Sequence, residues 1–346
     1  MKNKSSLLVI TALCVLCAIS FWLYKNKTSG STLNKDARNF AVEDTSVITK
    51  IFLADKDGKS VTVEKKGNAW IVNGKYPARP DAISLLLYTM KMVDVKSPVS
   101  KAAREAVIKR MATSSIKVEI YEGEELIKQY YVGHESLDND GSYMILTNLS
   151  NGENYDEPYL TFIPGFTGFL APRYITDESE WRDRVVVNYI PPNLKTIKLE
   201  LAENPDSSFV INLKSTTQFE LKKLNGQDIA FDESKMKQYL AYFQNISYEK
   251  LLTNFNKKLC DSLRSAMPYM KLTITDTKNE TKVFNFLHKN STFEINKKYG
   301  IDYKYDPDRC FMRYDNDKEV ALVQFYVFGK LLPTYVYFLP KNTVKK

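Results

Sequence analysis

The most function-like residues of this chain form one short cluster, Trp181-Arg182-Asp183-Arg184. A tryptophan beside two arginines can stack on a sugar ring or clamp an anionic group. Trp181, Arg182 and Arg184, together with Tyr174, are therefore the predicted ligand-binding residues. The competing interpretation is a latch, in which Trp181 is buried at the junction between two globular units. In that case the arginines pair with the neighbouring acids Asp183, Glu178 or Glu180.

The two histidines, His134 and His288, are the obvious residues to test for a metal or proton site. A zinc site needs three or four ligands, so two histidines cannot complete one. The segment Ser136–Gly141 resembles the start of a calcium loop. However, its first and twelfth positions are Ser136 and Thr147, where such a loop needs Asp and Glu. We predict structural histidines, a solvated hairpin loop, no metal site and no cofactor.

Residue patterns for catalysis are missing from the sequence. There is no glycine-flanked serine elbow, no Walker loop, no HExxH pattern and no cysteine–histidine pairing. A carboxylate pair for glycan hydrolysis depends on spatial separation, and the sequence singles out no acid. We therefore predict a non-enzymatic protein without catalytic residues. Cys260 and Cys310 either form a disulfide, in a compartment that permits one, or remain two buried thiols.

The elements that position these residues occur twice. The heptad Gly168–Tyr174 returns as Gly329–Tyr335, and Ile116–Ile120 returns 154 positions later as Met270–Ile274. The two histidines are separated by the same 154 positions. A fixed period indicates repeated structural units. The sequence therefore predicts two tandem α+β repeats, residues 46–175 and 194–340, joined by a junction at 176–193.

Each repeat is expected to contain three strands, two helices and four further strands. In the first repeat the strands begin near Val47, and Asn73-Gly74 marks a tight turn, as Asn225-Gly226 does in the second. A helix follows from Pro80, with apolar residues at helical spacing, and a second helix is expected to start at Ser97-Pro98. This order predicts an α+β fold with mainly antiparallel sheets.

The N-terminus carries a membrane signal. Leu7–Tyr24 is an uncharged, mostly apolar run that reaches roughly 27 Å as a helix, enough for a bilayer core. We predict an uncleaved transmembrane anchor at 1–24 and a polar stalk at 25–45. A signal peptide cleaved after Ser20 is the alternative. A lipoprotein is disfavoured, because Cys14 and Cys17 both follow leucine.

The net charge of +8 does not indicate nucleic-acid binding. Residues 1–40 carry +5 and the basic tail 341–346 carries +3, which leaves residues 41–340 neutral. A nucleic-acid binder needs a basic field on its folded domains. We therefore predict no nucleic-acid partner.

The anchor, the repeated units, the turn Trp70–Gly74 and the cluster Trp181–Arg184 together resemble the domain-of-unknown-function 4340 family over residues 48–338. The resemblance implies a single-pass protein of the bacterial inner membrane, with its C-terminal domains in the periplasm. It also implies an accessory role beside an ABC-type transporter, with the permease subunits as partners. The alternative is a protein that binds an envelope glycan or small solute in a groove between the repeats.

Overall fold

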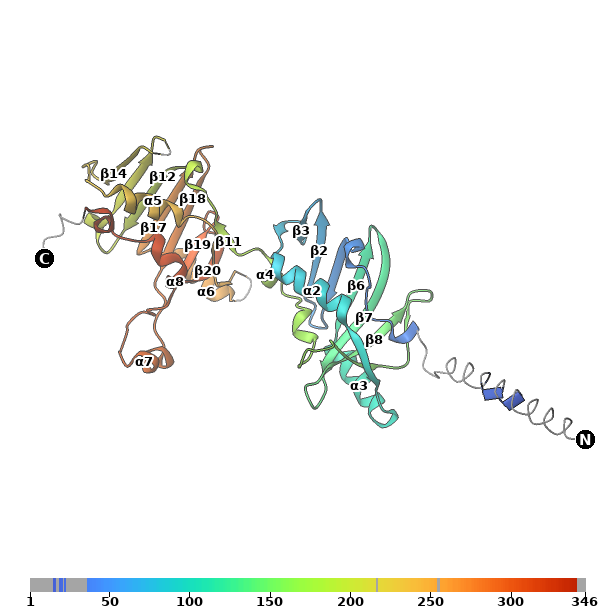
Figure 1. The fold of residues 1–346 in the computed structure, drawn as a ribbon. Helices are drawn as coiled ribbons and strands as arrows, with labels where there is room; N and C mark the ends of the chain where they lie inside the picture. The colour runs from blue at the N-terminus through green and yellow to red at the C-terminus, as the bar shows by residue number, and fades with distance from the viewer. Residues whose placement is uncertain are drawn as a thin grey trace, which may run out of the picture. The chain divides into compact units, whose positions relative to one another are not determined.

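In the computed structural model, residues 15–16, 19–20, 22, 36–215, 217–253 and 256–340 are described. The chain divides into two compact units, residues 1–178 and 179–346 (Figure 1). The predicted α+β class with mainly antiparallel sheets is confirmed. Most of the predicted anchor and the basic tail lie outside the described residues. Within the described part of the chain, no helix is both long and apolar enough to cross a bilayer.

Unit 1 is built around one large antiparallel sheet with the order β4-β3-β2-β1-β6-β7-β8-β10-β5 and β9 beside β8. Its strands are β1 Lys50–Ala54, β2 Ser60–Lys66, β3 Ala69–Val72, β4 Tyr76–Pro77, β5 Asp94–Pro98, β6 Ile116–Glu122, β7 Glu125–Glu135, β8 Ser142–Asn148, β9 Glu153–Asn154 and β10 Tyr159–Phe162. Its two long helices are α2 Pro80–Met92 and α3 Lys101–Ser114.

The local sequence explains these elements. β1 and β2 alternate buried and partly exposed residues, because successive side chains of a strand point to opposite faces. Asn73 and Gly74 adopt positive φ values of 49° and 68°, as the tight turn after β3 requires. Helix α2 begins with Pro80 at its first turn and buries Ile83, Leu86 and Met90.

Two sequence predictions for unit 1 need correction. The Ser97-Pro98 pair does not start the second helix: it ends strand β5, which pairs with β10, and α3 begins at Lys101. Residues 36–45 were expected in the polar stalk, yet Phe40 is 1% exposed and packs edge-on against Tyr130 and Tyr159. The folded part of unit 1 therefore begins before residue 46, because Phe40 supplies part of its core.

Unit 2 holds an antiparallel sheet with the order β14-β13-β12-β17-β18-β19-β20-β16 and a separate pair, β11 with β15. Its strands are β11 Val185–Val187, β12 Leu194–Leu201, β13 Phe209–Leu213, β14 Phe219–Lys223, β15 Ile246–Ser247, β16 Lys250–Leu251, β17 Met270–Asp276, β18 Thr281–Leu287, β19 Arg309–Tyr314 and β20 Glu319–Gln324. Its helices are α5 Glu233–Ala241, α6 Lys257–Ser265, α7 Phe293–Tyr299 and α8 Phe325–Phe328, after the short α4 Glu178–Trp181 at the boundary.

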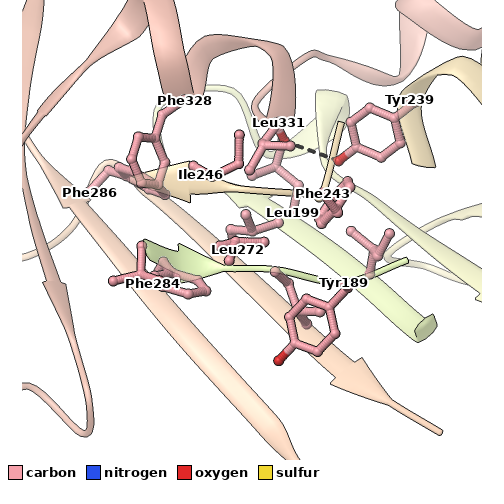
Figure 2. Packing of buried hydrophobic residues seen from close by; sticks show 14 of the residues in the cluster. Tyr189, Leu199, Tyr239, Phe243, Ile246, Leu272, Phe284, Phe286, Phe328 and Leu331 are labelled. Atoms are coloured by element: carbon pink, nitrogen blue, oxygen red, sulfur yellow. Dashed lines mark hydrogen bonds between the residues drawn. The ribbon is translucent and has the colours of Figure 1, made fainter. Parts of the chain in front are cut away.

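The core of unit 2 is rich in aromatic residues (Figure 2). Tyr239 of α5 is fully buried, and its hydroxyl donates a 3.0 Å hydrogen bond to the carbonyl of Leu331. Val187 and Tyr189, which the sequence placed in the junction, belong to this core. The junction therefore ends earlier than predicted, because Val187 and Tyr189 are buried with the residues of unit 2.

The strands of the two sheets follow one another in corresponding orders. Read from β3 to β5, unit 1 matches unit 2 read from β14 to β16, with every neighbouring pair antiparallel. The connections differ at one place. Six residues join β7 to β8, whereas 21 residues join β18 to β19. The longer connection carries α7, a helix that the repeat pattern did not predict.

Candidate interaction site

The predicted ligand-binding residue Tyr174 lies inside unit 1. It is fully buried, and its hydroxyl is 3.2 Å from the hydroxyl of Tyr130, which is also fully buried. Burial raises the pKa of Tyr174 to about 12 and that of Tyr130 well above its ordinary value. Tyr174 thus has the environment of a core residue, with its polar atom satisfied internally.

Removing the Tyr174 hydroxyl should leave the hydroxyl of Tyr130 buried without its partner. We expect Tyr174→Phe to lower the free energy of unfolding by about 1–2 kcal/mol. The double variant Tyr130→Phe/Tyr174→Phe should recover part of this loss, because no orphaned hydroxyl remains. Urea unfolding monitored by circular dichroism measures both effects. A double variant less stable than Tyr174→Phe by a further 1–2 kcal/mol would contradict this explanation.

The other three predicted ligand-binding residues lie at the start of unit 2. Trp181 is 2% exposed at the end of α4. Arg182 forms a 2.9 Å ion pair with Glu319, and both side chains are 9% exposed. Arg184 pairs with Glu180 at 2.6 Å, as the latch interpretation predicted. Arg182 also reaches a carboxylate that the sequence analysis did not name, Glu319 on β20.

The ion pair is built into a polar network within unit 2. Burial by itself lowers the pKa of Arg182, but its hydrogen bond and attraction to Glu319 raise that pKa above its ordinary value. Glu319 also accepts a 2.7 Å hydrogen bond from the hydroxyl of Thr253. The Asp183 carboxylate accepts a 3.1 Å hydrogen bond from the backbone N–H of Val185. These contacts fix the position of the cluster at 181–184 within unit 2. A role of this cluster in ligand binding remains a prediction.

The histidines also have structural surroundings. The ring of His288 is stacked between Tyr269 and Tyr305, with 3.8 Å between ring centroids on each side, and one ring nitrogen lies 2.9 Å from Glu203. His134 lies in β7 beside Tyr143. Burial, followed by the nearby positive charge of Arg110, lowers the pKa of His134. Among the described residues no group of His, Cys, Asp and Glu is arranged to hold a metal ion.

The loop Ser136–Gly141 joins β7 to β8, as predicted for a hairpin loop. The Ser136 hydroxyl accepts a 3.0 Å hydrogen bond from the N–H of Asp140, whose carboxylate pairs with Lys96. Cys260 and Cys310 are both buried and free, so the thiol alternative is the one that the structure contains. Burial raises the pKa of Cys310 to about 12, which keeps it in the unreactive thiol form.

Unit 2 contains an excursion of the chain, residues 288–308, that we call the arm and that carries several exposed apolar side chains. In Figure 1 the arm extends away from the sheet and carries α7 at its end. No residue of α7 is buried. Phe293, Tyr299 and Ile301 are 77%, 40% and 53% exposed, respectively. An exposed aromatic and aliphatic set of this kind is typical of a contact surface.

The arm is nevertheless built with regular local structure. The Thr292 hydroxyl accepts a hydrogen bond from the N–H of Ile295 at the start of α7, and Gly300 ends the helix with a φ of 66°. The Asn296 side chain accepts a 2.6 Å hydrogen bond from the Ser291 hydroxyl and donates a 2.7 Å one to Asp302. These bonds fix the conformation in which the apolar side chains face outward.

Contacts between the two ends of the arm close its base. Lys289 forms a 2.7 Å ion pair with the fully buried carboxylate of Asp306, and Tyr305 stacks on His288. Next to this base is a pocket of about 370 Å³. It is lined by Lys298, Pro307, Asp308, Arg309, Gln324, Phe325 and Tyr326. Tyr326 is 94% exposed. Because Lys298, Pro307 and Asp308 of the arm line the same pocket as Tyr326, the pocket and the arm form one candidate interaction site.

The sequence analysis missed this site, although a signal was present. The residues between the two repeated strands outnumber those of the first repeat, and Thr292 and Gly300 are typical helix-boundary residues. Comparison of the chain with protein-family models, curated proteins and solved structures finds no match.

Proposed function

We propose that this chain is a non-enzymatic, membrane-anchored extracytoplasmic interaction module, accessory to an ABC-type transporter of the bacterial envelope. The observation that carries the proposal is the arm of unit 2, whose helix α7 buries no side chain and which exposes Phe293 in that helix and Ile301 after it. Ordering the 21 residues of the arm costs conformational entropy. Apolar side chains that stay exposed to water contribute no hydrophobic stabilisation to offset that cost. A partner that covers the arm supplies the missing burial.

The architecture belongs to the same proposal. We infer two tandem copies of one α+β fold after an N-terminal transmembrane helix, which places both copies in the periplasm. The corresponding strand orders of the two sheets support the duplication. The insertion of the arm in the second copy alone supports a task that the first copy does not share. The permease subunits of the transporter are the proposed partners.

The burial of Trp181 and Tyr174 favours this proposal over the glycan- or solute-binding alternative. A side chain that stacks on a sugar must be reachable, whereas these two are 2% and 0% exposed. Arg182 and Arg184 are likewise engaged by Glu319 and Glu180. By contrast, the aromatic side chains of Phe293 and Tyr326 are 77% and 94% exposed, so a partner can reach them.

Co-purification tests the proposal. The tagged full-length chain is captured from detergent-solubilised membranes of its own bacterium, and the proteins bound to it are quantified by mass spectrometry. We expect permease subunits of an ABC transporter with the unaltered chain. The variant Phe293→Ser/Tyr326→Ser should lose them at least about tenfold, because exposed aromatic anchors dominate binding energy. Since neither side chain is buried, its thermal stability should match that of the unaltered chain.

The matched control is Leu137→Ser, which alters a side chain that is 99% exposed in the β7–β8 loop of unit 1. This variant should retain the permease subunits. Recovery of no transporter subunit with the unaltered chain would overturn the assignment of the partner. Equal recovery with the arm variant would overturn the assignment of the surface.

A further inference from the structure

The sheet of unit 2 has a gap inside it, beside the first half of β18. On one side, β17 pairs with β18 from Thr281 to Phe286. On the other side, β19 pairs with only the last three residues of β18, Asn285–Leu287. The residues 281–284 therefore have a neighbouring strand on one side only.

The register shows which backbone groups face the gap. The N–H of Asp276 donates a 3.0 Å hydrogen bond to the carbonyl of Glu280, at the turn between β17 and β18. Because hydrogen-bonding direction alternates along an antiparallel strand, residues 282 and 284 point toward β17. Thr281 and Val283 point the other way. Within the described part of the chain, no hydrogen bond reaches the backbone N–H or C=O groups of these two residues.

The gap exists because β19 ends early. Asp315, Asn316 and Asp317 adopt left-handed conformations with φ values of 52°, 54° and 64°. The N–H of Lys318 then donates to the carbonyl of Asp315 and closes the turn into β20. A 3.0 Å hydrogen bond from the side chain of Asn285 to Asp317 holds this turn against β18. The turn therefore occupies the position from which β19 would otherwise have continued.

Beside this turn lies a pocket of about 300 Å³, a volume at the lower end of the range for ligand pockets. Its lining includes Val185 and Val186 of β11, Thr281, Lys282 and Val283 of β18, and Asp315 of the turn. The ammonium of Lys282 is engaged by the carbonyl of Val186 at 3.3 Å. The exposed carboxylate of Asp315 makes no ion pair with any described residue, which leaves a negative charge at the edge of the pocket.

We propose that this pocket binds an extended polypeptide segment of another protein, which pairs with β18 by strand addition. The N–H and C=O groups of Thr281 and Val283 supply the main-chain hydrogen bonds. Val185, which borders the pocket from β11, contacts an apolar side chain of the segment, and Asp315 favours a lysine or arginine in it. This inference does not rest on the proposed function, because none of these residues belongs to the arm.

Amide hydrogen exchange, measured by NMR on the full-length chain in detergent micelles, tests the premise and the binding. In the free chain the amides of Thr281 and Val283 should exchange at least about 100-fold faster than those of Lys282 and Phe284, which are hydrogen-bonded to β17. The probe is a blocked valine–lysine–valine–lysine–valine peptide. It should slow exchange at Thr281 and Val283 at least about tenfold and leave Lys282 and Phe284 unchanged.

Two variants and a second peptide make the test specific. Val283→Pro removes one of the two outward N–H groups and should abolish binding. Asp315→Asn keeps a residue that tolerates positive φ. In the unaltered chain, the same peptide with glutamate in place of lysine should bind about fivefold more weakly, and Asp315→Asn should erase that preference. This second variant decides the matter if Val283→Pro fails to fold.

Slow exchange of Thr281 and Val283 in the free chain would overturn the premise, and no protection by either peptide would overturn the site. A lysine preference that survives in Asp315→Asn would overturn the role assigned to that carboxylate. The result of the co-purification with the arm variant does not affect these exchange and binding measurements. The proposed function and the proposed peptide site can therefore be refuted independently.

Discussion

Replacement of Arg182 by methionine is expected to lower the free energy of unfolding of unit 2 by about 3–5 kcal/mol, the range for breaking a buried ion pair from one side. The variant leaves the carboxylate of Glu319, whose side chain is 9% exposed in the unaltered chain, without its positive partner but with the hydrogen bond from the neutral hydroxyl of Thr253. Desolvating a carboxylate without an opposite charge is costly, so the loss exceeds that of a surface pair. Urea unfolding of the purified chain, followed by far-ultraviolet circular dichroism, measures it.

The double variant Arg182→Met/Glu319→Leu is the matched control. It removes both charges and keeps apolar volume in their place, so most of the lost stability should return. Arg184→Met supplies a second comparison, because its pair with Glu180 is about 30% exposed and should cost about 1 kcal/mol or less. If Arg182→Met and Arg184→Met cost the same, the buried pair has no special structural role.

Truncation of Trp181 is the second prediction with a large effect. We expect Trp181→Ala to destabilise the chain by about 3 kcal/mol, because the residue is 2% exposed and its loss leaves a large cavity. Trp181→Phe should lose less, since an aromatic ring still fills most of the volume. Thermal melts recorded at one protein concentration measure both variants.

Trp70→Ala is the control for the loss of an indole ring as such, because Trp70 is only partly buried on β3. It should cost clearly less than Trp181→Ala. A melting temperature that is unchanged by Trp181→Ala would count against the structural latch and would revive the ligand-binding hypothesis for the cluster at 181–184.

The repeat in the sequence predicted the order of the elements well. The repeated segments Ile116–Ile120 and Met270–Ile274 are the strands β6 and β17, with ends that agree within two residues. This succeeded because half-buried antiparallel strands carry a period of two and end at turn residues such as Asn73-Gly74. Local patterns of this kind do not depend on which distant strand becomes the neighbour.

Features set by distant contacts could not be predicted in the same way. The pairing of Arg182 with Glu319 joins residues 137 positions apart, and nearby acids were the more obvious partners. Strand β5 forms from Asp94–Pro98 because β10 lies beside it, although proline and charged residues disfavour a strand. The exposed face of α7 gives no periodic signal at all, since the helix has no buried side.

The outer strands of the two sheets have a consequence for the behaviour of the chain at high concentration. β4 is two residues long and contains proline, β5 ends in proline, β14 carries Glu220, Lys222 and Lys223, and β16 is again two residues long. Short, charged or proline-containing borders discourage one molecule from extending the sheet of another. Crowding alone should therefore not drive this chain into ordered aggregates through the borders of its sheets.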